Sequence, residues 1–365
     1  MAHNKITFFI SSLNSGGAER QCALIANDLV RRNFKVTICS FNSAPSFYSL
    51  SPEVEHRPLG VLSRSGRLFE RLYSIFRRLF VVRKILSEAP EGTVFVSFMD
   101  ITNMLCILSS IGLSQRLVAM ERSDPSHQPR SRIVKFLRSL IYRRAGHIVV
   151  QSQSAQKYFA TFPRVSVLRN IATNLNSPKP PNSLPRGKSL PFVCISRLSK
   201  EKGVPELVKS FQQFAKEILP GEVTLDIYGT GPLLTELSDY LEQQKLTEMI
   251  HLKGLHPNIA QNLHNYSALL LHSQYEGFPN VILEGLSSGL QVIATPTAGS
   301  NEIYRLINSP RLILAEPSHF PDTLTSFYKG FQHGNHSSAK ALDLSSFSSE
   351  NVVDDFLAIV QSPNV

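Results

Sequence analysis

The chain contains two successive series of short apolar strands separated by segments with helical periodicity. The first series includes KITFFIS, KVTICSF, VFVSF, RLVAM and GHIVVQS, and Glu19–Arg31 is one of the helical segments between them. Strands that alternate with helices form parallel sheets with helices on both faces. The sequence therefore predicts a doubly wound α/β domain, Rossmann-like in architecture, over residues 1–172.

The alternation stops at residues 173–190, which are rich in Pro, Ser and Asn and predict a linker. It then restarts with the strands LPFVCISRL, VTLDIYG, MIHLKG, ALLLHS and QVIAT. A second Rossmann-like domain is predicted over residues 191–345. Residues 346–365 are predicted to form a C-terminal helix that packs back on the first domain. Two such domains bind ligands in a cleft at the carboxyl ends of their strands.

Composition limits the class of protein and its location. A chain of 365 residues with 42% apolar residues suits two domains. Stretches of the roughly 18 apolar residues needed to span a membrane are absent, as is a signal peptide. The four cysteines are scattered and predict reduced thiols. We therefore expect a cytoplasmic protein.

The strongest motif follows a buried strand, turns at a glycine and opens a helix near Pro279, a favoured first helical position. It reads SQYEGFPNVILE, from Ser273 to Glu284. The free N–H groups at a helix start attract anionic or oxygen-rich ligands. A carboxylate beside them, Glu276, is able to accept hydrogen bonds from sugar hydroxyls. The alternative is that Glu276 caps the helix and Glu284 lies on a solvated face.

This motif, followed by GLQVIAT, closely resembles glycosyltransferase family 4, whose members have the GT-B fold. Three more segments match the family in the expected order: SGGAER at 15–20, SRLSKEKG at 196–203 and YGTGP at 228–232. Four ordered motifs are more specific than any one alone. The resemblance covers nearly the whole chain. It implies a retaining hexosyltransferase that moves a hexose or N-acetylhexosamine from a UDP-sugar to a polyprenyl-diphosphate-linked saccharide, in bacterial surface polysaccharide or glycan assembly.

The resemblance implies a role for each matched residue. The catalytic residues are Glu276, which holds the transferred sugar, and Arg197 and Lys202, which stabilise charge on the departing diphosphate. For the two cations, the alternative is an exposed surface position. The expected donor-binding residues are Gly16, Gly17, Gly229, Gly231, Gly277, Phe278, Pro279, Asn280 and Glu284. The two cations replace a metal, so no metal or other cofactor is expected, and the UDP-sugar is a substrate.

One position departs from the family pattern. Family members often carry a His after a Glu in the N-terminal domain, near the donor sugar. Here Arg122 follows Glu121, and an arginine cannot act as a general base. We expect Arg122 to contact a phosphate and Asp124 to lie near the acceptor.

Charge is concentrated in the first half of the chain. Residues 1–176 carry 24 Lys and Arg against 10 Asp and Glu, whereas residues 177–365 carry 14 against 18. The basic segments 64–86 and 129–144 also have amphipathic periodicity, which is typical of contact with anionic lipid. A solvated basic face is the alternative. The resemblance adds that the arginines bind the acceptor's diphosphate, with Arg77, Arg78 and Arg138 as candidates.

These features predict a peripheral protein on the inner face of the cell membrane, with a UDP-sugar and a lipid-linked saccharide as partners. Motifs for nucleic-acid binding are absent. Two other functions stay open: a UDP-sugar 2-epimerase of the same fold, and a non-catalytic membrane-docking, sugar-binding protein. An enzyme is favoured over the non-catalytic protein by the presence of Arg197, Lys202, Glu276 and Glu284. Neither the sugar nor the oligomeric state is specified by the sequence.

Overall fold

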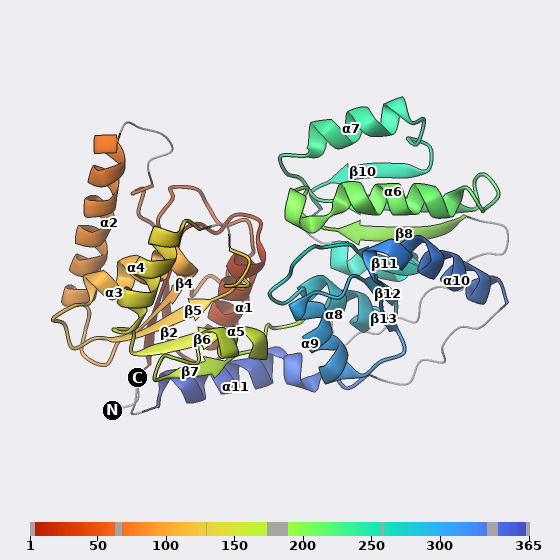
Figure 1. Cartoon of the computed structure of the whole chain (residues 1–365). Coiled ribbons are helices and arrows are strands. Elements are labelled where there is room, and N and C mark those ends of the chain that lie inside the picture. Colours follow the sequence, from red (N-terminus) through yellow and green to blue (C-terminus); the bar gives the residue numbers. More distant parts are fainter. Residues whose placement is uncertain are drawn as a thin grey trace. The chain divides into compact units, whose positions relative to one another are not determined.

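The computed structural model divides into two compact units (Figure 1). Unit 1 comprises Met1–Ile171 and Ser346–Val365, and unit 2 comprises Ala172–Ser345. The structure describes residues 4–62, 68–128, 130–173, 189–256, 259–333 and 342–362. Most of the predicted linker at 173–190 therefore lies outside the described residues.

Unit 1 is built on a seven-stranded parallel sheet with the order β3-β2-β1-β4-β5-β6-β7. Its strands are β1 (Lys5–Ile10), β2 (Lys35–Ser40), β3 (Glu55–Pro58), β4 (Val94–Phe98), β5 (Arg116–Glu121), β6 (His147–Val150) and β7 (Val165–Val167). Its helices are α1 (Gly17–Arg31), α2 (Leu68–Glu88), α3 (Asp100–Ser109), α4 (Arg132–Tyr142), α5 (Gln153–Tyr158), the 3-10 turn η4 (Ser345–Phe347) and α11 (Ser349–Val360). The strand order reverses between β1 and β4, and such a switch point is where doubly wound sheets bind ligands.

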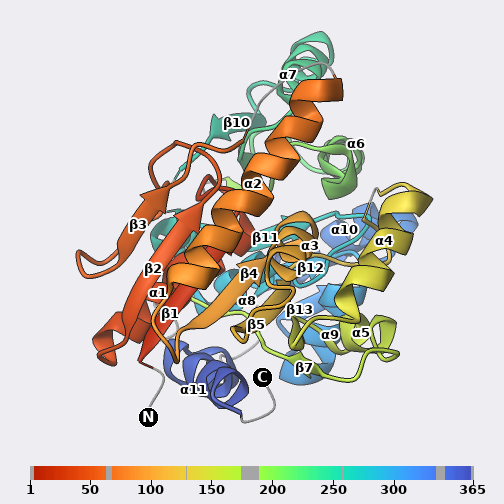
Figure 2. The same cartoon turned by 90° about the vertical axis from the view of Figure 1, so that its left-hand side faces the viewer.

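The side chains of the unit 1 strands alternate between two apolar layers. Phe8 packs with α1 and α11 on one face, where its ring lies 6.1 Å from that of Phe356. Phe9 packs on the other face with α2, α3, α4 and α5. Figures 1 and 2 show α2, α3 and α4 side by side along that second face. The C-terminal helix α11 is thus part of the core of unit 1.

Unit 2 repeats the architecture with a six-stranded parallel sheet in the order β10-β9-β8-β11-β12-β13. Its strands are β8 (Leu190–Ile195), β9 (Val223–Tyr228), β10 (Ile250–Gly254), β11 (Ala268–Leu271), β12 (Gln291–Ala294) and β13 (Leu312–Leu314). Its helices are α6 (Val204–Ala215), α7 (Leu234–Gln243), α8 (Asn280–Ser287), α9 (Ala298–Ile307) and α10 (Phe320–Gln332), with 3-10 turns η1 (Lys200–Lys202), η2 (Ile259–Asn265) and η3 (Pro317–His319). Its switch point lies between β8 and β11.

The predicted fold class, two doubly wound α/β domains, is confirmed. The sequence analysis missed three edge strands for physical reasons. β3 has the polar sequence EHRP, and a proline is tolerated only at a sheet edge. β7 and β13 are each three residues long, too short to show a period. All four cysteines are buried free thiols, as predicted.

The packing of α11 predicts that truncation of its central aromatic ring destabilises unit 1. Phe356 is 1% exposed, so Phe356→Ala leaves a large cavity and lowers the free energy of unfolding by about 3–5 kcal/mol. Hydrogen exchange would detect faster exchange in β1 and α1. An equal acceleration in β9 of unit 2 would show that the helix does not belong to unit 1.

Candidate active site

Three loops of unit 2 meet at the carboxyl edge of its sheet. They follow β8, β9 and β11, and they contain the predicted segments 196–203, 228–232 and 273–280. Backbone hydrogen bonds join the loops: Leu198 N donates to Thr230 O at 3.0 Å, and Gln274 N donates to Glu201 O at 2.9 Å. Residues from three separate motifs therefore lie in one site.

The centre of this site is an ion pair between Lys202 and Glu276. Lys202 Nζ lies 2.6 Å from Glu276 Oε1, and the two side chains are 22% and 11% exposed. Ser273 Oγ donates to the same carboxylate oxygen at 2.9 Å. Partial burial of opposite charges favours their pairing, because each alone would pay a desolvation cost. The carboxylate is thus held in place on two sides.

Glycines allow the loops to approach this closely. Gly203 has a φ of +59°, and a Cβ there would lie 2.0 Å from His272 O. At Gly229, with a φ of +142°, a Cβ would lie 1.9 Å from Ser196 O. A side chain at either position would push one loop away from its neighbour, so these glycines fix the position of Lys202.

Helix α8 begins beside the ion pair. Pro279 is its N-cap residue rather than its first helical residue, and no side chain caps the helix. Gly299 N donates to Glu276 O at 3.1 Å, which holds the Gly277 turn against the start of α9. Phe278 and Glu284 are buried, at 6% and 5% exposure. Glu284 is therefore not the solvated face residue of the alternative interpretation.

Arg197 lies at the rim of the site. Its side chain is 67% exposed and its Nη2 lies 3.2 Å from Glu201 Oε1. Burial alone would raise the pKa of Glu201, but hydrogen bonds from Ser199 and the backbone and the charges of Arg197 and Lys202 outweigh it and lower that pKa. The loop thus carries a stable carboxylate that pairs with the exposed guanidinium of Arg197.

Unit 1 presents a glycine turn at the carboxyl end of β1. Gly16 is the N-cap of α1 with no side-chain cap, and Gly17 is the first helical residue. Gly16 exchanges two hydrogen bonds with the hydroxyl of Tyr48: its N–H donates to Oη at 2.9 Å and its carbonyl accepts at 2.8 Å. The Glu19 carboxylate fills the space beside Gly16, where a Cβ would lie 2.2 Å from Oε2.

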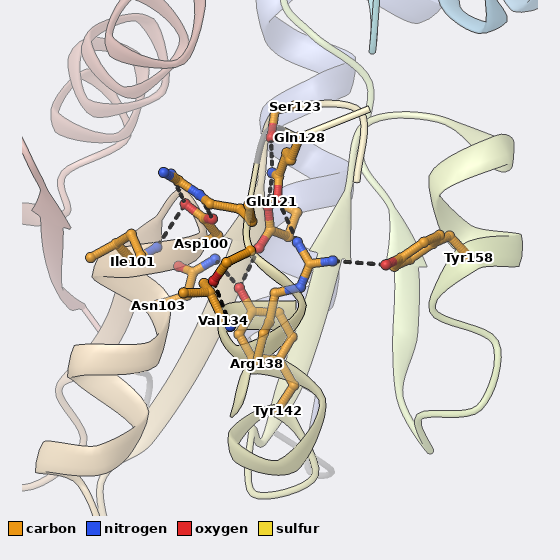
Figure 3. Close-up of polar contacts among 12 residues, drawn as sticks. Asp100, Ile101, Asn103, Glu121, Ser123, Gln128, Val134, Arg138, Tyr142 and Tyr158 are labelled. Carbon is orange, nitrogen blue, oxygen red and sulfur yellow. Dashed lines mark hydrogen bonds and ion pairs between the residues drawn. The ribbon is translucent and has the colours of Figure 1, made fainter. Parts of the chain in front are cut away.

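A buried polar network covers the carboxyl end of β5 (Figure 3). Glu121 is fully buried, and the Tyr142 hydroxyl donates to its carboxylate. Asn103 Nδ2 donates to the Tyr142 hydroxyl at 3.0 Å. Burial raises the pKa of Glu121 to about 7, the charge of Asp100 acts in the same direction, and the Tyr142 hydrogen bond opposes them.

The loop between β5 and α4 lies over this network and is tied down by its own side chains. Arg130 forms two hydrogen bonds with Asp100, at 2.7 and 2.9 Å. Gln128 donates to Ser123 and accepts from Arg138 (Figure 3). Asp124 accepts from Ser126 N at 2.9 Å and lies 2.8 Å from His127 Nδ1. Asp124 therefore orients an imidazole within its own loop.

Arg122 is 7% exposed, and its Nη1 donates to Leu168 O and Asn170 Oδ1, both at 2.9 Å. Its Nε and Nη2 are buried without a hydrogen-bond partner among the described residues, and its contact with a phosphate stays a prediction. The predicted position of Arg138 needs correction. Arg138 is 3% exposed, and its guanidinium contacts Gln128, the Tyr158 hydroxyl and the Phe159 ring. It is therefore not part of an exposed basic surface.

The other two predicted cations lie on α2. Arg77 is exposed, whereas Arg78 is half-buried and its Nε donates to Ser74 O at 3.0 Å. Burial lowers the pKa of Arg78. Residues 64–67 and 129 of the two basic segments lie outside the described residues. Of this pair, only Arg77 is fully presented at the surface.

Two doubly wound α/β units of this kind are the architecture of the GT-B class of glycosyltransferases. The chain belongs to glycosyltransferase family 4. Residues 15–171 match the model "Glycosyltransferase Family 4", and residues 190–327 match "Glycosyl transferases group 1". The family, the GT-B fold and the hexosyltransferase activity predicted from the sequence are confirmed.

Characterised relatives match most of the chain. An α-1,4-N-acetyl-D-galactosaminyltransferase of Campylobacter jejuni, named for the acceptor GalNAc-α-(1→4)-GalNAc-α-(1→3)-diNAcBac-PP-undecaprenol, is 31% identical over 77% of this chain and 76% of its own. The amylovoran biosynthesis glycosyltransferase AmsD of Erwinia amylovora is 24% identical over 77% of each chain. The crystal structure of HepE from Anabaena in complex with UDP has the same fold, with a TM-score of 0.73 at 18% identity, covering 98% of this chain and 100% of HepE.

The sequence analysis assigned no role to several residues of these sites. Ser273 stood in the quoted motif, and its hydroxyl contacts Glu276. Glu121 stood beside Arg122, but only the structure shows its enclosure by Tyr142 and Asn103. Tyr48 carries no sequence signal, because its bond to Gly16 joins positions 32 residues apart.

The raised pKa of Glu121 predicts a pH-dependent stability of unit 1. A carboxyl group whose folded pKa is about 7, against an ordinary 4.5, stabilises the fold fully below pH 4.5, and the contribution disappears as pH rises through 7. Glu121→Gln stays uncharged, so at pH 8 it is more stable than the wild type by on the order of 2–3 kcal/mol. Urea unfolding at pH 4.5 and 8, followed by hydrogen exchange in β5, measures this. The exposed Glu91→Gln is the control, and equal shifts in both variants would contradict the interpretation.

Proposed function

We propose that the protein is a retaining glycosyltransferase that transfers a hexose or N-acetylhexosamine from a UDP-sugar to a lipid-linked saccharide. The contact between Lys202 Nζ and Glu276 Oε1 at the start of α8 carries the proposal. It brings a cation and a carboxylate to a helix start that no side chain caps, within reach of one nucleotide sugar. Relatives named for diphospho-undecaprenol acceptors support the choice of acceptor class.

The proposed mechanism uses each group of the unit 2 site once. The diphosphate binds at the uncapped α8 start, where Lys202 and the exposed Arg197 stabilise negative charge as the sugar bond breaks. Glu276 accepts hydrogen bonds from sugar hydroxyls, and Glu284 accepts those of the ribose. The acceptor hydroxyl attacks the sugar from the face that the diphosphate leaves. The departing phosphate oxygen takes the proton of this hydroxyl. The cations supply the charge stabilisation for which other transferases use a metal.

The need for an added acceptor distinguishes sugar transfer from the main alternative, a UDP-sugar 2-epimerase reaction. A UDP-sugar 2-epimerase converts the donor alone and releases no nucleotide in proportion to an added saccharide. We expect UDP release to depend on an extracted polyprenyl-linked saccharide. Conversion of the UDP-sugar to an epimer without acceptor would favour the rival.

Lys202 is predicted to act in the chemical step. Lys202→Met removes the cation beside the diphosphate and should lower kcat about 10²- to 10³-fold, as loss of one electrostatic stabiliser does in other enzymes. Lys200→Met changes an exposed lysine of the same 3-10 turn and leaves kcat within about twofold of the wild type. UDP release in the presence of lipid-linked saccharide measures both. If Lys202→Met retains full activity, the proposed site is wrong.

We also propose that unit 1 docks on an anionic membrane through α2 and α4. The outer face of α4 carries Ile133, Phe136, Leu137 and Leu140, which are 71%, 67%, 44% and 46% exposed. On α2, Tyr73, Phe76 and Phe80 are 70%, 68% and 70% exposed. The inner face of α4 instead buries Arg138 and Tyr142. The helix thus turns its apolar stripe outward, opposite to the usual arrangement in a soluble protein.

Cations flank these apolar side chains. Arg77, Arg83 and Lys84 on α2 are exposed, as are Arg132, Arg143 and Arg144 on and after α4. Apolar side chains bordered by Lys and Arg are typical of helices that lie in the interface of an anionic bilayer. None of the described helices is long and apolar enough to cross a membrane. Both α2 and α4 lie on the same face of the sheet (Figure 2).

A charge on the apolar stripe should weaken membrane binding. Phe136→Glu removes an exposed aromatic ring that would enter the lipid and adds charge repulsion, so the partition coefficient onto vesicles with one-third phosphatidylglycerol should fall at least about tenfold. Leu219→Glu, at a 70% exposed position of unit 2, is the matched control and keeps wild-type binding. Vesicle co-sedimentation measures both. Equal loss in the two variants would contradict docking through α4.

A further inference from the structure

Unit 1 contains a cavity at the amino edge of its sheet, away from the strand ends that carry the Glu121 network. Its volume is about 350 Å³. The walls come from the end of α3, the following turn, the start of β5 and the segment after α4. The lining residues are Ile107, Ser110, Ile111, Gly112, Leu113, Ser114, Gln115, Arg116, Leu117, Arg144 and Gly146.

Two arginines and no acidic residue stand among the lining residues that the structure describes. Arg116 is half-buried, and its Nη1 is buried without a hydrogen-bond partner among the described residues. A buried donor without a partner costs about 1–3 kcal/mol, so an oxygen-bearing ligand that reaches it gains this free energy. Arg144 is exposed at the mouth of the same cavity. The cavity therefore carries two positive charges, and no carboxylate of its described lining neutralises them.

The C-terminus of α3 repels a bound anion only weakly. Carbonyl groups at a helix C-terminus carry partial negative charge. Here a third arginine already binds them: Arg83 Nη1 donates to Ser109 O at 3.0 Å and to Ile111 O at 2.8 Å. Arg116 and Arg144 are not needed for that task. The Ser114 hydroxyl and the backbone at Gly112 and Gly146 add polar groups to the wall, whereas the Ser110 hydroxyl already donates to Ile107 O at 2.9 Å.

Exposed apolar side chains lie on the cavity lining and on the chain within one helical turn of it. Ile111, which lines it, is 48% exposed, and Leu108 on the preceding turn of α3 is 39% exposed. Leu140, one turn before Arg144, is 46% exposed and belongs to the apolar stripe of α4. A charged cavity beside exposed aliphatic side chains matches a ligand with a phosphate and acyl chains.

We propose that this cavity binds the phosphate of an anionic phospholipid head group, with the acyl chains along Ile111, Leu108 and Leu140. The guanidinium groups of Arg116 and Arg144 bind the phosphate oxygens, and the Ser114 hydroxyl binds the remainder of the head group. None of the residues proposed for sugar transfer lines this cavity, so it selects the lipid surface without taking part in the reaction. The phosphate chemistry is shared with free phosphate, and the apolar border favours the lipid.

Soluble short-chain lipids test the site without a membrane. Dihexanoylphosphatidylglycerol below its micelle concentration should bind the full chain saturably at one site, observed by isothermal titration. Arg144→Gln and Arg116→Gln should each weaken this binding at least about tenfold, the effect of losing a hydrogen bond to a charged group. Arg143→Gln removes the neighbouring exposed cation, which does not line the cavity, and should leave the affinity within about twofold.

Further measurements distinguish a lipid phosphate from free phosphate and show whether a variant is misfolded. Inorganic phosphate should bind at least about tenfold more weakly than the lipid, because it lacks acyl chains. Equal affinity would overturn the lipid assignment in favour of free phosphate. Arg116→Lys keeps the charge but not the planar donor pair, so it should fold and still weaken binding. The titration contains no sugar donor, so its outcome is independent of the proposed sugar transfer. No saturable binding, or equal loss in Arg143→Gln, would overturn the proposal.

Discussion

The ion pair between Lys202 and Glu276 is the interaction on which the unit 2 site depends. It joins loops that follow β8 and β11, two strands that pair directly in the sheet. The pair forms because Gly203 lets the first loop pass within contact of His272 O, which no residue with a Cβ allows. Removal of either charge would leave the other partly buried without its partner. An unpaired buried charge destabilises a fold more than apolar side chains at both positions would. The Glu276 carboxylate and the Lys202 ammonium group are therefore positioned before any ligand arrives.

This part of the site was accessible from the sequence because it follows general rules of α/β topology. Strand–helix alternation predicts parallel strands, and parallel strands place the residues after their carboxyl ends at one edge. Arg197, Lys202, Gly229 and Glu276 each follow such a strand, although Lys202 and Glu276 are 74 residues apart. The edge strands were missed because EHRP, VSV and LIL are too short or too polar to show a period. Their absence from the prediction did not disturb the site, which lies at the centre of the sheet.

The orientation of α4 was not accessible from the sequence. Helical periodicity shows that Ile133, Phe136, Leu137 and Leu140 share a face, but it does not say whether that face points to the core. The inward face is decided by tertiary contacts of Arg138 with Gln128 and Tyr158 and of Tyr142 with Glu121. The same limit applies to Arg122, whose partners Leu168 and Asn170 lie more than 45 residues away. Charge and period identify an amphipathic helix, and only its buried polar partners fix its rotation.

The inverted α4 links two features of unit 1 that the sequence presents separately. Its inner face supplies Tyr142 and Arg138 to the network that encloses Glu121 at the carboxyl end of β5. Its outer face supplies the apolar stripe, and the chain just beyond its end supplies Arg144 to the amino-edge cavity. A polar network inside and an apolar stripe outside is a costly arrangement for a helix in water, since exposed apolar area gives up the hydrophobic gain of burial. This cost in free energy disappears where lipid covers the apolar stripe. A bilayer on the outer face of α4 would therefore complete the core of unit 1 on the side that the chain itself leaves open.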